Sequence, residues 1–197
     1  MIKSPIPLAS EKLQFRAIGI IYGTFIAINP HCLNKGRIID KDGFQIDVVV
    51  LGKALPILKK FVNFEKQYFW IVYPRNKNTE CLHLQIAGIW DPNNFKEERI
   101  SKFEESNKIL SSINLKDNLF SIRGKLVFIN VAQEEIIIKI CTFNTNKNQT
   151  KSFKVTLKGL IPMQFINSFV SIDAYRKSNT LYLDKFEIIE DKSFEIK

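Results

Sequence analysis

The order of β-prone segments in the second half of the chain constrains the fold more than any other feature. Five such segments follow one another there, at residues 120–130, 136–143, 152–158, 169–176 and 180–189. Gly159 and Pro162 interrupt the pattern after the third segment. Five short strands with one break after the third are the order of a small Greek-key barrel. The sequence therefore predicts such a barrel in this half.

The first half of the chain repeats the same order. Its predicted strands lie at residues 15–28, 36–39, 44–51, 68–73 and 81–90. Between the third and fourth, the spacing of Leu55, Leu58, Phe61 and Val62 changes to that of a helix, with Pro56 in the first turn. A second barrel with one short helix is therefore predicted.

Matching residues support a duplication of one five-stranded unit. Phe15 precedes Gly19 by four residues in the sequence FRAIG, and Phe120 precedes Gly124 in the sequence FSIRG. After the third strand, Gly52 with Pro56 in the first half corresponds to Gly159 with Pro162 in the second. In the last hairpin, Tyr73 corresponds to Tyr175. The offset between the two halves is nearly the same at all three places. We interpret these pairs as an internal repeat, with the first strands aligned at Gly19 and Gly124.

This order of elements resembles that of a tandem OB-fold protein, and the resemblance covers most of the chain. We expect an all-β protein with minor helices: one OB-like barrel at residues 14–92, a partly helical connector at 93–117, and a second barrel at 118–191. The main alternative fold is one larger lipocalin-type barrel. A Gly-x-Trp sequence near the first strand would support that alternative, and none occurs.

The resemblance implies a binding function. OB-folds bind single-stranded nucleic acids or oligosaccharides on strands 2 and 3 and two flanking loops, and they also dock proteins. The 29 Lys and Arg exceed the 20 Asp and Glu, which gives a net charge of +9 and favours an acidic partner. We therefore predict a non-catalytic protein that binds single-stranded nucleic acid, RNA ahead of DNA.

Lysines and aromatic residues in the second unit indicate where this ligand binds. Apolar and polar residues alternate along residues 136–143 and 152–158, so one face of both strands is apolar and the other is basic. Basic residues of the loops join this face, including those that follow Tyr73 and Tyr175. The predicted nucleic-acid contacts are Lys139, Phe143, Lys147, Lys151, Lys154, Lys158, Arg75, Lys77, Arg176 and Lys177. The alternative interpretation is a solvated outer face, because lysine often protects strand edges.

A second functional hypothesis concerns the first unit. Its fourth strand is apolar on both sides, and aromatic residues are frequent in protein interfaces. Tyr68, Trp70 and Tyr73 would then bind a partner protein, and the chain would be an adaptor or a subunit of a larger complex. The alternative is that these side chains pack inside the barrel.

Enzymatic function finds little support in the sequence. His31 and His83 are the only histidines, and Cys32, Cys81 and Cys141 are widely spaced, so neither set has the spacing of a metal site. No phosphate-binding glycine loop or serine-nucleophile motif occurs. We predict no catalytic residue, no metal and no cofactor. Unpaired thiols and the lack of a signal-like N-terminus favour the cytoplasm, and the sequence leaves the oligomeric state open.

Overall fold

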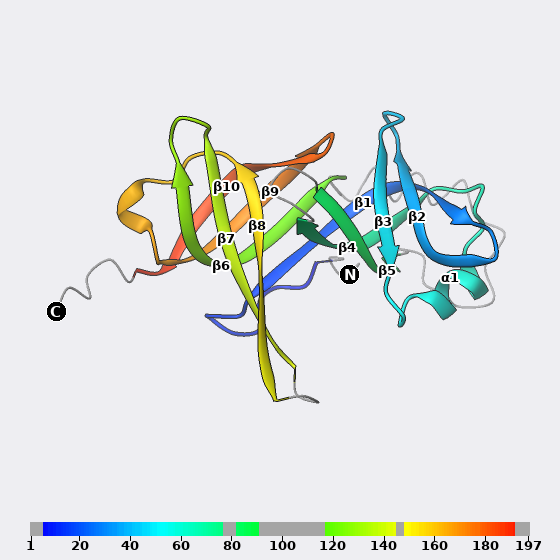
Figure 1. Ribbon diagram of the computed structural model, residues 1–197, viewed down its shortest axis with the longest axis horizontal. Coiled ribbons are helices and arrows are strands. Elements are labelled where there is room, and N and C mark those ends of the chain that lie inside the picture. Colours follow the sequence, from blue (N-terminus) through cyan, green and yellow to red (C-terminus); the bar gives the residue numbers. More distant parts are fainter. Residues whose placement is uncertain (1–5, 77–81, 91–116, 145–147, 192–197) are drawn as a thin grey trace.

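The computed structural model describes residues 6–76, 82–90, 117–144 and 148–191, which form two barrels side by side (Figure 1). The first barrel contains β1 (Arg16–Asn29), β2 (Cys32–Asp40), β3 (Gln45–Val50), α1 (Leu55–Phe61), β4 (Tyr68–Asn76) and β5 (Leu82–Trp90). The second contains β6 (Leu119–Asn130), β7 (Glu135–Asn144), β8 (Gln149–Lys158), the short 3-10 helix η2 (Met163–Phe165), β9 (Phe169–Lys177) and β10 (Thr180–Glu190).

Strand pairing closes each barrel separately. In the first barrel β1 pairs with both β2 and β4, and β3 runs parallel to β5. In the second barrel β6 pairs with both β7 and β9, and β8 meets β10 in parallel where Lys158 faces Tyr182. This is the strand order of the OB-fold in both halves. The prediction of two OB-like barrels is confirmed, and the single lipocalin-type barrel is wrong.

The alternation seen in the sequence places the core inside each barrel. Successive side chains of a strand point to opposite faces, so every second residue of β7 and β8 faces inward. Ile136, Ile138 and Ile140 are at most 1% exposed, and Val155 and Leu157 are fully buried. The apolar face predicted for these two strands is therefore the barrel core, and the polar face points outward.

The predicted helix of the first barrel is confirmed as α1. It begins at Leu55 with Pro56 in the first turn, where a missing backbone N–H leaves no hydrogen bond unmade. Leu58 is fully buried against the core. Lys59 and Lys60 lie in the last turn, where cations are favourable beside the carbonyl end of a helix.

The alignment of Gly19 with Gly124 is wrong. The glycine of the first barrel in the place most like that of Gly124 is Gly23. Gly23 pairs with both β2 and β4, and Gly124 lies directly before Lys125, which pairs with both β7 and β9. A Cβ atom on either glycine would collide with a carbonyl oxygen of the second strand of its barrel. Gly19 instead faces Phe120, and a Cβ there would overlap the Phe120 ring. Gly19 therefore makes room for a contact between the barrels.

The two barrels share a backbone ladder. β1 and β6 pair in antiparallel fashion from Arg16 opposite Arg123 to Gly19 opposite Phe120. The Asp117 carboxylate, just before β6, accepts a 2.8 Å hydrogen bond from the backbone N–H of Tyr22 in β1. We call this contact the seam. Because the seam joins the two barrels through backbone hydrogen bonds, a site between them has defined walls.

Some predictions fall on residues that lie outside the described part of the chain. These are the connector at 93–117, apart from Asp117, and the loop residues Lys77 and Lys147. Within the described part, no helix has the length and apolar character needed to cross a membrane.

Candidate functional site

Three lysines form a row across the outward face of the second barrel. Lys125 of β6 lies directly opposite Lys139 of β7, and Lys139 lies directly opposite Lys154 of β8. Lys125 and Lys139 are half-buried, whereas Lys154 is exposed. Neighbouring strands are about 4.8 Å apart, so the row spans roughly 10 Å. We call these three residues the lysine row.

The lysine row places three positive charges side by side. Among the described residues, no carboxylate forms an ion pair with any of the three. Like charges directly opposite one another destabilise a sheet. The same strands of the first barrel differ, because Arg37 of β2 pairs with Asp47 of β3 at 3.2 Å. The arrangement therefore favours an anionic ligand on the second barrel.

An exposed aromatic ring lies beside the lysine row. Phe128 of β6 faces Ile137 of β7, which in turn faces Thr156 of β8. The Phe128 side chain is 44% exposed, which leaves a flat apolar surface next to three cations. A ring in this setting can stack on a nucleic-acid base.

Sequence reasoning missed both Lys125 and Phe128. The ladder between β6 and β7 shifts register between Leu126 and Phe128, so simple alternation along β6 fails there. The sequence contained one signal for Lys125, which directly follows Gly124. The corresponding glycine of the first barrel, Gly23, lies where β1 passes from β4 to β2, and Lys125 lies where β6 passes from β9 to β7.

Lys158 does not belong to the lysine row. Its Nζ lies 3.8 Å from the Glu135 carboxylate and donates a 3.0 Å hydrogen bond to the Gln133 carbonyl oxygen. These contacts hold the amine at the end of β8, beside a pocket. Lys158 therefore borders a different part of the surface from Lys139 and Lys154.

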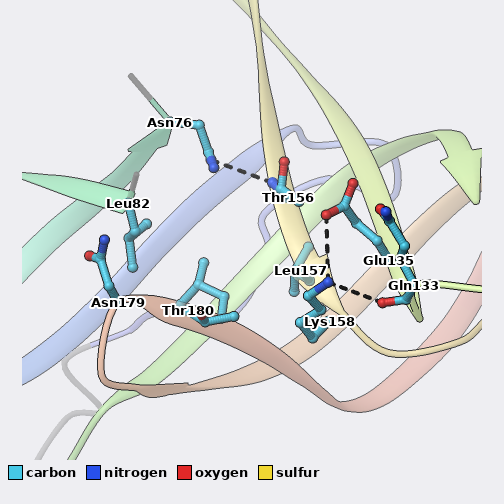
Figure 2. A pocket seen from close by; sticks show the side chains of 10 residues that line it. Asn76, Leu82, Gln133, Glu135, Thr156, Leu157, Lys158, Asn179 and Thr180 are labelled. Atoms are coloured by element: carbon cyan, nitrogen blue, oxygen red, sulfur yellow. Dashed lines mark hydrogen bonds and ion pairs between the residues drawn. The ribbon is translucent and has the colours of Figure 1, made fainter. Parts of the chain in front are cut away.

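The pocket has a volume of about 460 Å³ and lies between the barrels (Figure 2). Asn76 and Leu82 of the first barrel form one wall. The other walls come from the loop between β6 and β7, the end of β8, and the turn between β9 and β10. The two loops are those that flank the ligand face in OB-folds.

Arg176 corrects one predicted contact. Its side chain is buried, with the residue 5% exposed, and its donors bond to the Asn118 side chain at 2.8 Å, the Ser178 carbonyl at 2.5 Å and the Asp40 carboxylate at 2.5 Å. A guanidinium with all these partners is not available to a phosphate. Arg176 connects the two barrels instead.

The other predicted basic residues have varied surroundings. The Arg75 guanidinium lies 3.8 Å from the centre of the Phe153 ring, across the boundary between the barrels. Burial lowers the pKa of Arg75, and Tyr73 acts in the opposite sense. Lys151 and Lys177 are exposed. Phe143 lies in β7, and its side chain is outside the described part.

Trp70 is a core residue, so the predicted protein interface is wrong at its centre. The Trp70 side chain is fully buried, and its Nε1 donates a 2.8 Å hydrogen bond to the Gly23 carbonyl oxygen. Tyr68 packs against it edge-on with ring centres 5.9 Å apart, and Tyr73 is half-buried. Trp70, the central residue of the predicted interface, therefore belongs to the interior of its own barrel.

The strand order defines both halves as OB-fold domains, and the chain as a tandem OB-fold protein. Residues 17–97 match the family model of the PatR RNA-binding protein, N-terminal OB-fold domain. Residues 122–190 match the model of the cyanobacterial OB-fold-like RNA-binding domain, C-terminal. Together the two matches cover about three quarters of the chain, and each barrel is similar to one of these RNA-binding OB-fold domain families. A comparison with curated proteins found no match.

Proposed function

We propose that the second barrel binds a single RNA strand across the outward face of β6, β7 and β8. The observation that supports this proposal is the lysine row, which places three cations without a carboxylate partner among the described residues on one line. Cations without partners suit a phosphate backbone, because binding releases the counterions of the RNA. Phe128 beside the row supplies a surface on which one base stacks.

The face suits a single strand better than a duplex. Stacking on a side chain requires a base that is free of its own pairing partner. One exposed ring offers no hydrogen bonds to a base edge, so this part of the site binds with little sequence preference. Stacking on Phe128 is expected to contribute about 1–3 kcal/mol.

The salt dependence of binding tests the proposal. A labelled single-stranded RNA is titrated at several salt concentrations with the wild type and with Lys125→Ala/Lys139→Ala/Lys154→Ala. Each phosphate contact contributes about −0.7 to the slope of log K against log salt, so the triple variant should show a slope shallower by about 2.

A matched variant controls for net charge. Lys53→Ala/Lys59→Ala/Lys60→Ala removes the same charge from exposed positions at and before α1 in the first barrel. This variant should keep nearly the wild-type slope. Equal losses in both triple variants would reduce the effect to net charge and remove the site. Duplex RNA that competes as well as the single strand would contradict the single-strand proposal.

A further inference from the structure

We infer that the pocket between the two barrels accepts one unpaired base of the bound RNA and distinguishes one base from another. This inference rests on the proposed RNA-binding face and adds base recognition to it. The pocket is built from both barrels, so neither domain alone contains the whole site.

Three side-chain amides line the pocket. Asn76 comes from the end of β4, Gln133 from the loop between β6 and β7, and Asn179 from the turn between β9 and β10 (Figure 2). An amide presents a carbonyl acceptor and an NH2 donor side by side. This pair of groups matches the donor and acceptor on a base edge, as in the bidentate contacts of Asn and Gln with adenine. Amides therefore give the pocket a means of recognition that the lysine row lacks.

The amides are available to a ligand. Among the described residues, the side chains of Gln133 and Asn179 accept and donate no hydrogen bond. The Asn76 side-chain oxygen accepts a 3.4 Å hydrogen bond from the Thr156 backbone N–H across the barrel boundary. That contact orients Asn76 and leaves its NH2 group as a donor.

Three leucines lie at the base of the pocket. Leu82, Leu157 and Leu181 border it, and they are at most 6% exposed, so they close its base and leave little apolar surface for a ligand. Recognition in the pocket therefore rests on the amides. A volume of about 460 Å³ lies within the usual range of small-molecule sites, roughly 300–1,000 Å³, and suits one nucleotide.

The pocket is within reach of an RNA strand on the lysine row. Lys154, Thr156 and Lys158 follow one another on the outward face of β8, and Thr156 and Lys158 line the pocket. Alternate residues of a strand are about 7 Å apart. The end of the row and the pocket are therefore separated by a short step along β8.

The test compares affinities for short oligoadenylate, oligouridylate and oligocytidylate. The wild type should prefer one of them roughly tenfold or more, as expected from one good bidentate contact. Gln133→Ala/Asn179→Ala should reduce this preference to near unity while the salt slope stays unchanged. Asn76→Ala should also reduce it, because the first barrel forms one wall. Gln45→Ala, an exposed amide on β3, is the matched control.

Several outcomes would overturn the inference. A wild type without preference, or a double variant that keeps it, would show that the pocket reads no base. A preference that survives in Asn76→Ala would contradict a site built from both barrels. If the inference is right, the NMR signals of the side-chain NH2 groups of Gln133 and Asn179 should shift when an oligonucleotide is added to the protein. If nucleoside monophosphates alone bind there and RNA does not, the pocket is a small-molecule site instead. The lysine-row variants test the proposed RNA-binding face separately. Loss of these lysines is expected to change the affinity and the salt slope and to leave the base preference unchanged.

Discussion

The Asp40 carboxylate of the first barrel accepts a 2.5 Å hydrogen bond from the Arg176 guanidinium of the second barrel, and the two side chains are at most 3% exposed. The other oxygen of Asp40 accepts hydrogen bonds from the backbone N–H groups of Asp42 and Phe44. This ion pair therefore connects the turn after β2 to the end of β9. It stands at the boundary between the barrels, together with the seam.

Removing one partner of this pair should be costly. Arg176→Met leaves the Asp40 carboxylate buried without its counter-charge, and a loss of about 3–5 kcal/mol in unfolding free energy is expected. Asp40→Asn/Arg176→Met should lose much less than the sum of the single variants, since the double variant buries no unpaired charge. Urea unfolding measures all three. Single variants that lose under 1 kcal/mol would mean that water reaches the pair.

The contact between Gly19 and Phe120 should limit substitution at the seam. Gly19→Ala places a methyl group inside the present position of the Phe120 ring, so the ring or the ladder must shift. Overpacking of this kind costs about 1–3 kcal/mol. Gly88→Ala in β5 is the control, because a Cβ there meets nothing within 4 Å and should change stability by less than about 0.5 kcal/mol. Equal thermal unfolding curves for both variants would contradict a close contact at the seam.

Trp70→Ala should destabilise the first barrel rather than remove a partner. Truncation of a buried tryptophan costs about 3–5 kcal/mol. The variant also leaves the Gly23 carbonyl oxygen without the indole hydrogen bond. Denaturant unfolding measures the loss, with Met163→Ala, 60% exposed, as the comparison. A folded Trp70→Ala protein of wild-type stability would restore the interface hypothesis.

Lys139→Thr should change stability and binding in opposite directions. Lys139 lies between Lys125 and Lys154, and removing the central charge relieves two like-charge contacts worth about 0.2–1 kcal/mol each. The same change removes one phosphate contact, which makes the salt slope shallower by about 0.7. Thermal unfolding and RNA titration on one preparation test both effects. A variant that is less stable and binds RNA normally would contradict the role of the lysine row.

Asp117 should make stability depend on pH. Burial raises the pKa of Asp117, although hydrogen bonds from the backbone N–H groups of Tyr22 and Asn118 and the charges of Lys41 and Arg176 oppose the shift. The folded state therefore favours the protonated carboxyl, and that contribution is lost as pH rises through the folded pKa. Asp117→Asn lacks this titration, so its stability relative to the wild type should increase from about pH 3 to pH 7. A relative stability that falls over this range would reverse the sign of the shift.

Much of the architecture follows from the sequence alone. The period-two alternation of Ile136, Ile138 and Ile140 determines which face of β7 is buried, because side-chain direction in a strand depends only on position. The break at Gly159 and the helical spacing around Leu58 likewise indicate where each barrel leaves its third strand. Lys139 and Lys154 could therefore be placed on one outward face from local pattern.

The tertiary structure decided which charges are free. Arg75 and Arg176 follow similar tyrosine-containing segments, yet Arg75 stacks on Phe153 while Arg176 is buried against Asp40, 136 residues away along the chain. Lys125 joins the lysine row only through the register of β6 with β7, which a bulge alters. Local sequence determines the direction of a side chain. The neutralisation of its charge depends on segments that only the packing of the two barrels brings together.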